Sequence, residues 1–244
     1  MVKNWDSSER WYTSCVGEKG HYYHQAVVLP NALRLLGKKG SLLDLGCGQG
    51  VLARHLDQKI DYFGVDQSKE LISSAKKMTK RGQFFLADVT QGLPIEKKDF
   101  DLGCFILSLQ NMENGQGAIT TASSHIKQGG KLLIVLNHPC FRIPRQSDWG
   151  IDEKMKIQYR RMNQYLSPLA IPIQTNPGKS ESATTFSYHH PLSDYLQWLQ
   201  KSKMAILSME EWISDKKSTG PKAKIEDRAR KEFPLFLAIL AMKL

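Results

Sequence analysis

An apolar run that stops abruptly at closely spaced glycines constrains this chain more than any other feature. Residues 41–45 are mostly apolar and lead directly into the glycine-rich stretch 46–50. A second apolar run, 62–65, ends on Asp66. Glycine has no Cβ, so it permits tight turns and a close approach of the backbone to a ligand. The chain thus has a strand, a glycine turn, a helix start over 51–56 and a carboxylate about 20 residues farther on. This order of features predicts a nucleoside-binding βαβ unit.

The spacing of the glycines and the preceding acid distinguish between nucleoside ligands. Dinucleotide sites use G-x-G-x-x-G and reserve the helix N-terminus for a pyrophosphate. Here the spacing is G-x-G-x-G, and Asp44 stands two residues before Gly46. A carboxylate at that place would repel a pyrophosphate and suit a cationic ammonium group. The pattern resembles the first motif of the class I S-adenosylmethionine-dependent methyltransferases, acid-x-G-x-G-x-G.

The resemblance implies S-adenosyl-L-methionine as cofactor and gives each of its groups a partner. Asp44 would face the methionyl ammonium, directly or through water, and Asp66 would accept from both ribose hydroxyls. Asp88 matches the family's acid that meets the adenine amino group, although it could instead cap the turn before Gly92. The expected cofactor-binding residues are Asp44, Gly46, Cys47, Gly48, Asp66, Gln67, Asp88, Val89 and Ser108.

From residue 40 onward, apolar runs alternate with helical segments, which predicts an α/β fold with a parallel sheet covered by helices. The helices are expected to include one N-capped by Ser68, one ended by Gly129-Gly130 and one N-capped by Ser193. The order resembles the family's doubly wound, mostly parallel seven-stranded sheet with helices on both faces and an antiparallel last strand. The expected strands are 41–45, 62–66, 83–87, 100–108, 131–137, 204–212 and 233–242.

We expect a single methyltransferase domain over 1–244. Two of its segments fall outside the predicted sheet. Residues 1–39 are expected to form a helical lid, with a helix through Leu33 closed by Gly37. Residues 138–190 form an insertion with an expected helical centre over 152–165. It is too long for an ordinary connection, so we expect a cap over the site. The cofactor-binding core would be 40–137, and 191–244 the C-terminal part of the sheet.

The composition excludes several classes of protein. The chain is 41% hydrophobic, and no apolar run approaches the roughly 18 residues of a membrane span. The first residues lack the apolar stretch of a signal peptide, and the four cysteines lack metal-type pairing. We therefore expect a cytoplasmic protein with reduced thiols, no membrane span and no metal site.

A basic stretch, 216–231, supplies much of the formal net charge of +10. We expect a loop there. Such a loop can bind a nucleic acid backbone or an anionic lipid surface, but a solvated loop is the simpler interpretation. No aromatic residue interleaves with these charges before Phe233, which disfavours base stacking.

Motifs of specific acceptor classes are mostly absent. Adenine N6 enzymes place an Asn/Asp-Pro-Pro-aromatic turn where this chain has the segment 108–111. Cys140 stands near the sequence position where RNA-directed cytosine C5 methyltransferases have a nucleophilic cysteine. The companion Pro-Cys that those enzymes have after the fourth strand is missing from this chain. The favoured function is therefore methyl transfer to an O or N atom of a small molecule. The alternative is an RNA or protein methyltransferase that uses the basic 216–231 loop; a cofactor-binding module without catalysis and a nicotinamide-dependent oxidoreductase are further alternatives.

The acceptor site is expected to take residues from the lid and the cap. An imidazole near its free pKa is a suitable general base, and His21 and His138 are the preferred pair. A structural or solvated histidine is the alternative at either position. Arginines of the insertion could bind an acidic group of the substrate. The expected substrate-contacting residues are Tyr12, His24, Gln110, Asn137, Arg142, Trp149, Tyr188 and His189.

Overall fold

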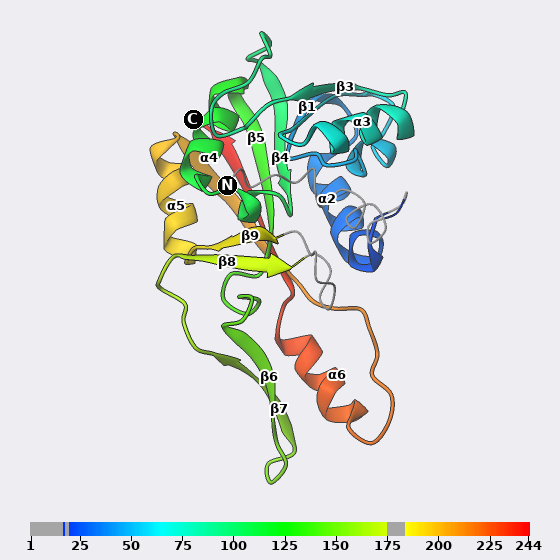
Figure 1. Cartoon of the computed structure of the whole chain (residues 1–244), viewed down its shortest axis with the longest axis vertical. Helices are drawn as coiled ribbons and strands as arrows, with labels where there is room; N and C mark the ends of the chain where they lie inside the picture. The colour runs from blue at the N-terminus through cyan, green and yellow to red at the C-terminus, as the bar shows by residue number, and fades with distance from the viewer. Residues whose placement is uncertain (1–16, 18–19, 175–183) are drawn as a thin grey trace.

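The structure, a computed structural model, describes residue 17 and residues 20–174 and 184–244, and its centre is a seven-stranded sheet (Figure 1). The strand order is β10-β11-β5-β4-β1-β2-β3. The five strands from β1 to β5 run parallel, whereas β11 is antiparallel to both of its neighbours. This confirms the predicted sheet. The strands are β1 (Gly40–Leu45), β2 (Ile60–Asp66), β3 (Gln83–Leu86), β4 (Phe100–Ile106), β5 (Ile126–Asn137), β10 (Met204–Trp212) and β11 (Phe236–Lys243).

Helices cover both faces of the sheet because its strands are apolar on both faces. Along β5, Leu133 and Val135 pack into one buried cluster, while Leu132 and Ile134 pack into the other. The first cluster contains side chains of α2 (Leu29–Leu36) and α3 (Lys69–Met78), and the second contains side chains of α4 (Gly115–His125) and α5 (Leu192–Lys201). None of the helices in the described ranges is both long and apolar enough to span a bilayer.

Several predicted boundaries are wrong, each for a local reason. The helix expected over 51–56 is only the 3₁₀ turn η3 (Leu52–Arg54), because little chain remains between the turn at Gly50 and the start of β2. β4 stops at Ile106, since Leu107 adopts a left-handed φ of 57°.

Two predicted helix ends also differ. Helix α4 ends at His125, and Gly129-Gly130 lie inside β5 instead of capping the helix. A Cβ on Gly130 would lie 2.6 Å from Cγ2 of Ile126, so the glycine accommodates the strand's close packing there. Pro191, not Ser193, precedes α5. In contrast, the Ser68 side chain caps α3 as predicted, and Gly37 ends α2.

The described residues of the insertion form two hairpins and no helix, so the helical centre expected over 152–165 is wrong. Strand β6 (Ser147–Asp152) pairs with β7 (Ile157–Met162), and β8 (Leu169–Gln174) pairs with β9 (Thr184–His189). β-branched and aromatic residues alternate with polar ones at the start of β7, a pattern typical of a strand. The basic stretch is also not a plain loop, because it contains α6 (Ala223–Glu232).

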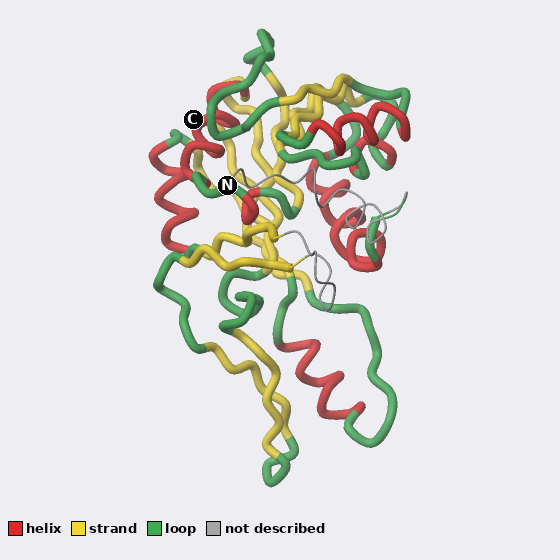
Figure 2. The backbone as a smooth tube through the Cα atoms, viewed as in Figure 1, coloured by secondary structure: helices red, strands yellow, loops and turns green. Residues whose placement is uncertain are grey.

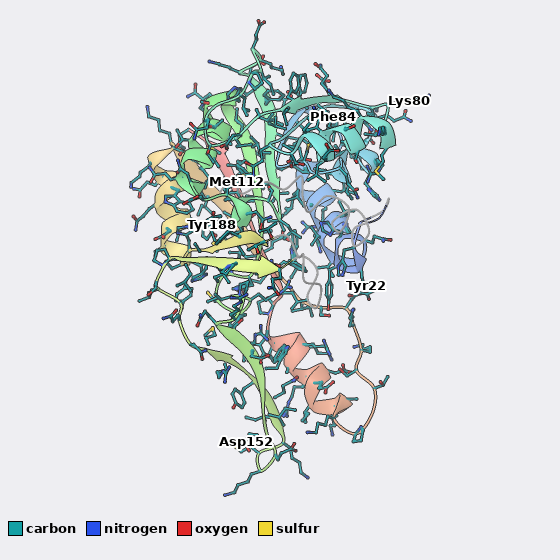
Figure 3. All side chains as sticks on the ribbon, in the orientation of Figure 1. Tyr22, Lys80, Phe84, Met112, Asp152 and Tyr188 are labelled. Atoms are coloured by element: carbon teal, nitrogen blue, oxygen red, sulfur yellow. The ribbon has the colours of Figure 1, made fainter. Side chains whose placement is uncertain are left out.

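Strands β6 and β7 together with α6 form a lobe that extends away from the sheet (Figure 2). We call these three elements the projecting lobe. Strand β7 packs against α6 within it. Figure 3 places Asp152 near the tip of the lobe, and Met112 and Tyr188 near the centre of the molecule. The two hairpins of the insertion therefore have different neighbours: β8–β9 lies at the sheet edge and β6–β7 lies in the lobe.

Candidate active site

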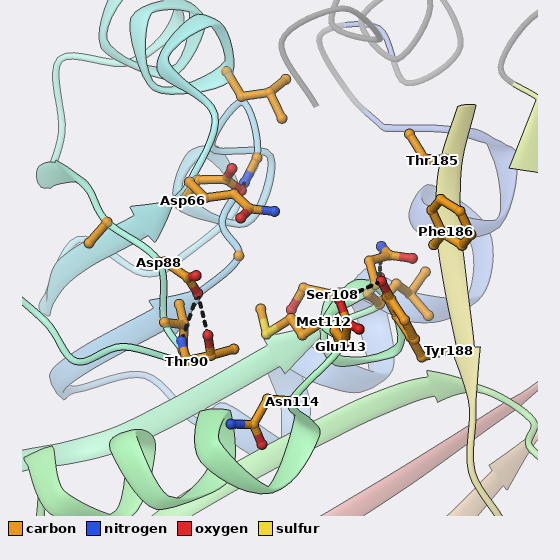
Figure 4. A pocket seen from close by; sticks show the side chains of 18 of the residues that line it. Asp66, Asp88, Thr90, Ser108, Met112, Glu113, Asn114, Thr185, Phe186 and Tyr188 are labelled. Atoms are coloured by element: carbon orange, nitrogen blue, oxygen red, sulfur yellow. Dashed lines mark hydrogen bonds between the residues drawn. The ribbon is translucent and has the colours of Figure 1, made fainter. Parts of the chain in front are cut away.

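A cavity of about 510 Å³ lies outside the carboxyl ends of β1, β2 and β4 (Figure 4). Ligands of open α/β sheets bind at this edge, where the strand order reverses. The β1–β4 pair and the β1–β2 pair place that reversal at β1. The predicted cofactor-binding residues that line the cavity are Gly46, Gly48, Asp66, Gln67, Asp88, Val89 and Ser108.

The glycine turn is fixed between β2 and the segment that follows β4. Gly46 and Gly48 have φ values of 79° and 54°, which favour glycine. The N–H of Gly46 donates to the Val65 carbonyl oxygen at 2.8 Å. A Cβ on Gly46 would lie 2.5 Å from Cβ of Ser108, whose hydroxyl donates to the Leu45 carbonyl oxygen at 2.6 Å. The turn therefore presents bare backbone to the cavity.

Asp66 is oriented by backbone donors on both of its oxygens. Its Oδ2 accepts from the N–H of Gly48 and its Oδ1 from the N–H of Ser68, each at 2.9 Å. The residue is buried, yet it lines the cavity. Hydrogen bonds from N–H groups stabilise the ionised carboxylate. The cavity thus contains a fixed acceptor of hydrogen bonds at the end of β2.

Asp88 lines the cavity and also holds the turn that its sequence position suggested. Its Oδ1 accepts from the N–H of Thr90 at 2.9 Å and from the Thr90 hydroxyl at 2.8 Å. The buried side chain of Val89 also lines the cavity. In Figure 4, Asp66 and Asp88 lie on the same side of the cavity.

Asp44 and Cys47 lie behind the cavity wall and do not line it. The phenol of Tyr62 donates to Oδ2 of Asp44 at 2.7 Å, and the thiol of Cys104 lies 3.4 Å from its Oδ1. Burial raises the pKa of Asp44 to about 6, although the hydrogen bond from Tyr62 opposes that rise. Burial also raises the pKa of the Cys47 thiol far above its ordinary value, which disfavours a nucleophilic role.

The opposite wall comes from residues that sequence reasoning mostly missed. Thr184, Thr185 and Phe186 of β9 line the cavity beside the predicted Tyr188. The phenol of Tyr188 donates to Oε2 of Glu113 at 3.4 Å and so links β9 to the loop after β4. Figure 4 shows Thr185, Phe186 and Tyr188 across the cavity from Asp66 and Asp88. The alternation of Thr184, Phe186 and Tyr188 with their neighbours was the sequence signal for this strand.

The loop after β4 supplies further lining residues that were not predicted. Asn111, Met112, Glu113 and Asn114 all line the cavity. Asn114 also N-caps α4, because its side chain accepts from the N–H of Gly117 at 2.8 Å. The predicted Gln110 points elsewhere and accepts from the N–H of Asn137 at 2.8 Å. Neither Gln110 nor Asn137 lines the cavity.

Of the predicted histidines, only His24 faces the cavity. Burial lowers its pKa to about 4, so the ring is neutral at physiological pH. His21 is exposed to solvent. His138 lies 2.7 Å from Oε1 of Glu211, and its Nδ1 accepts from the N–H of Cys140. These two partners contact both ring nitrogens of His138, and neither His21 nor His138 lines the cavity.

The other predicted substrate residues lie elsewhere. His189 is buried with its Nε2 2.6 Å from the Tyr165 carbonyl oxygen, away from the cavity. Arg142 and Trp149 line a second cavity of about 220 Å³. Tyr12 lies outside the described residues. Within the described part of the chain, no group of three His, Cys, Asp or Glu residues is arranged to hold a metal ion.

Comparison with known proteins finds a likeness over part of the core. Residues 43–134 match the family model described as a methyltransferase domain. Over 113 residues the chain is 31% identical to a demethylmenaquinone methyltransferase of Tropheryma whipplei, which covers 44% of this chain and 47% of that protein. Over 89 residues it is 33% identical to an 18S rRNA (guanine-N(7))-methyltransferase of Mus musculus, covering 34% of this chain and 31% of that protein. The chain thus spans about half the length, or less, of these relatives.

A solved structure extends the likeness to the whole fold. An S-adenosylmethionine-dependent methyltransferase from Mesorhizobium loti superposes with a TM-score of 0.67 at 22% identity. The overlap covers 89% of this chain and 99% of that one. The architecture is therefore that of the class I methyltransferase fold, including the segments on either side of residues 43–134.

Proposed function

We propose that this chain, a class I S-adenosylmethionine-dependent methyltransferase by its fold and by the family of residues 43–134, transfers a methyl group to an oxygen or nitrogen atom of a small molecule. One observation carries the proposal: a single cavity has acids and bare glycine backbone on one wall and the aromatic strand β9 on the other. Its volume of about 510 Å³ is typical of small-molecule sites.

The residues of the first wall fit the cofactor. When bound, S-adenosyl-L-methionine supplies an electrophilic methyl group on a sulfonium. Asp66 would accept from the ribose hydroxyls, because its oxygens face the cavity and each can accept more than one hydrogen bond. Asp88 and Val89 would contact the adenine. The turn at Gly46 and Gly48 would allow the methionyl part to approach the backbone.

Asp44 would act on the methionyl ammonium from behind the glycine turn. A cation above the turn favours the ionised carboxylate, whereas burial favours the protonated one. Affinity for a ligand with that ammonium should therefore increase from pH 5 to pH 7, as Asp44 loses its proton near pH 6. Asp44→Asn should remove this increase.

The second wall would hold the acceptor. Methyl transfer requires the acceptor atom, the methyl carbon and the sulfur to lie in line, so alignment is the main task of the protein. The contact between Tyr188 and Glu113 keeps β9 against the loop after β4. His24 replaces His21 and His138 as our candidate for contact with the acceptor, since it faces the cavity as a neutral imidazole.

An RNA methyltransferase is the second candidate, because one relative is named as an 18S rRNA methyltransferase and α6 is rich in basic residues. A nucleic acid complex weakens steeply with salt, because cations are released from the phosphates. A small acceptor without multiple charges should respond little. Methyl transfer to separated small-molecule and RNA fractions, each measured between 50 and 200 mM salt, would distinguish the two.

The binding test uses S-adenosylhomocysteine in isothermal titration. We expect saturable binding to the wild type and at least about tenfold weaker binding to Asp66→Ala, because charge-assisted hydrogen bonds to the ribose are lost. Asp99→Ala is the matched control, since Asp99 is an exposed acid paired with Lys97 far from the cavity lining. Binding of NADH but not of S-adenosylhomocysteine would contradict the proposal.

A further inference from the structure

Arginines gather around the second cavity, which lies where the projecting lobe joins the sheet. Arg142 comes from the segment after β5, Arg160 from β7 and Arg230 from α6. Among the described residues, the others that line this cavity are neutral, and none of them is Asp or Glu. The cavity volume is about 220 Å³. Three cations from separate parts of the chain therefore converge on one small space.

These guanidinium groups have little counter-charge among the described residues: burial lowers the pKa of Arg160, and Asp148 lies near enough to raise it by a smaller effect. None of the three forms an ion pair with a carboxylate there. Burial lowers the pKa of Arg142; Tyr23 opposes that effect, and the neighbouring Arg160 adds to it. Clustered, partly buried cations that form no ion pair are unfavourable, so the arrangement favours an external anion.

Each arginine also uses only part of its hydrogen-bonding capacity. Arg160 donates from Nε to the Phe141 carbonyl oxygen at 2.7 Å and from Nη2 to the Ser147 hydroxyl at 3.0 Å. Arg230 directs Nε and Nη2 at one oxygen, the Ser218 hydroxyl. Arg142 has a contact of 3.5 Å to the Leu235 carbonyl oxygen, at the limit for a hydrogen bond. Since a guanidinium carries five N–H donors, donors are left over in all three.

Aromatic rings hold two of the guanidinium groups in place. Arg160 lies over Trp149 at 5.0 Å from the ring centroid, and Arg142 lies over Phe236 at 5.2 Å. Trp149 packs edge-on against Phe233, which also lines the cavity. Stacking on a ring orients the planar fork of arginine, and a planar fork matches the oxygens of phosphate or carboxylate. The groups are thus ordered before any ligand binds.

Consecutive residues connect this cavity with the larger one. Tyr23 lines the 220 Å³ cavity and His24 lines the 510 Å³ cavity. Tyr23 also packs against Phe236 and shares a hydrogen bond of 3.1 Å with the Ser214 hydroxyl. The two cavities therefore lie on either side of the chain at residues 23–24, at the same end of the sheet.

We propose that the second cavity binds one oxyanionic group, a phosphate or a carboxylate, of the methyl acceptor. This inference rests on the proposed function, because it assigns the reacting part of the same acceptor to the larger cavity. The small volume and the convergence of three donors suit a single anionic group. The acceptor is accordingly a small anionic molecule long enough to reach past residues 23–24.

The test measures anion binding by the full chain without cofactor, so that it does not depend on methyl transfer. Isothermal titration uses inorganic phosphate in one arm and acetate in the other, with ionic strength held constant by sodium chloride. We expect saturable binding of at least one of them, weakened about tenfold or more in Arg160→Gln and in Arg230→Gln. Arg228→Gln is the matched control on the same helix, since Arg228 is exposed and outside the cavity.

S-adenosylhomocysteine binding checks each variant's fold and separates the two proposals. Normal affinity for it in Arg160→Gln and Arg230→Gln, together with lost anion binding, supports the site. If the wild type binds S-adenosylhomocysteine but neither phosphate nor acetate, the inference of an anion site is overturned and the proposed function is not. Anion binding without S-adenosylhomocysteine binding supports the anion site and overturns the proposed function.

A third arm addresses a polyanionic ligand. A short single-stranded RNA should bind no more tightly than phosphate if the cavity accepts a single group. RNA binding that is tighter, and that falls equally in Arg228→Gln, Arg160→Gln and Arg230→Gln, would overturn the inference in favour of an exposed basic surface.

Discussion

The phenol of Tyr62 donates a 2.7 Å hydrogen bond to Oδ2 of Asp44, and both side chains are buried beneath the glycine turn. The residues lie on adjacent parallel strands, β2 and β1. Gly64 leaves space for this contact, because a Cβ at that position would lie 2.9 Å from the Tyr62 hydroxyl. The Asp44 carboxylate therefore lies behind the cavity wall, away from water, and accepts a short hydrogen bond from Tyr62.

We expect Asp44 to destabilise the fold as pH rises. Its folded pKa of about 6 lies above its ordinary value of 3.8, so between those pH values the folded state retains a proton that the unfolded state has lost. Stability therefore falls as pH rises through this window, by about 3 kcal/mol in total. Urea unfolding of the wild type and of Asp44→Asn at a series of pH values should show this fall in their difference.

The companion variant Tyr62→Phe removes the donor that favours the ionised carboxylate. The pKa of Asp44 should then rise further, and the fall in stability should extend to higher pH. A difference between wild type and Asp44→Asn that does not change with pH would contradict the assignment.

Gly46→Ala should reduce both stability and cofactor affinity. Alanine at a φ of 79° costs about 1–2 kcal/mol in backbone strain. Its Cβ would also lie 2.5 Å from Cβ of Ser108, which adds at least about 1 kcal/mol from overpacking. Gly37→Ala is the control, because Gly37 has a similar φ of 76° and open space around it. Chemical unfolding should show a larger loss for Gly46→Ala; equal losses would contradict the packing argument.

His24 should remain neutral in the folded protein down to about pH 4. Because its pKa is lowered from 6.5, the unfolded state binds a proton first, and the contribution of His24 to stability is lost as pH falls from about 6.5 through 4. Titration of the histidine ring signals by NMR would check this directly. His24→Gln should weaken acceptor binding, whereas His21→Gln, at an exposed position, should leave it unchanged.

Tyr188→Phe should raise the KM for the acceptor while leaving affinity for S-adenosylhomocysteine unchanged. The substitution removes the hydrogen bond to Glu113 but keeps the ring beside Phe186. Loss of one hydrogen bond to a charged group corresponds to about 1.5–3 kcal/mol. Tyr159→Phe, on the projecting lobe, is the control. Equal effects of both variants on steady-state kinetics would show that β9 does not position the acceptor.

The wall that we propose for the cofactor was predictable because its signals are local. The glycines at 46 and 48 and the acid at 66 belong to one βαβ unit, and the backbone of that unit places them together. The wall that we propose for the acceptor was less predictable. His138 follows β5 at the expected edge, yet its ring contacts Glu211 of β10, two strands away in the sheet, and does not line the cavity. That contact joins residues far apart in the sequence.

By itself, the sequence determined most strands of the sheet and the glycine turn, because apolar periodicity and turn residues act over a few neighbouring positions. The arrangement of the strands and the antiparallel last strand were expected from the family resemblance. Only the tertiary structure decided that β9 closes the cavity, that Asp44 lies behind it and that Arg142, Arg160 and Arg230 converge on a second one. Those placements depend on how the insertion and α6 pack against the sheet edge. Packing between distant segments is a property of the whole fold, and no local pattern encodes it.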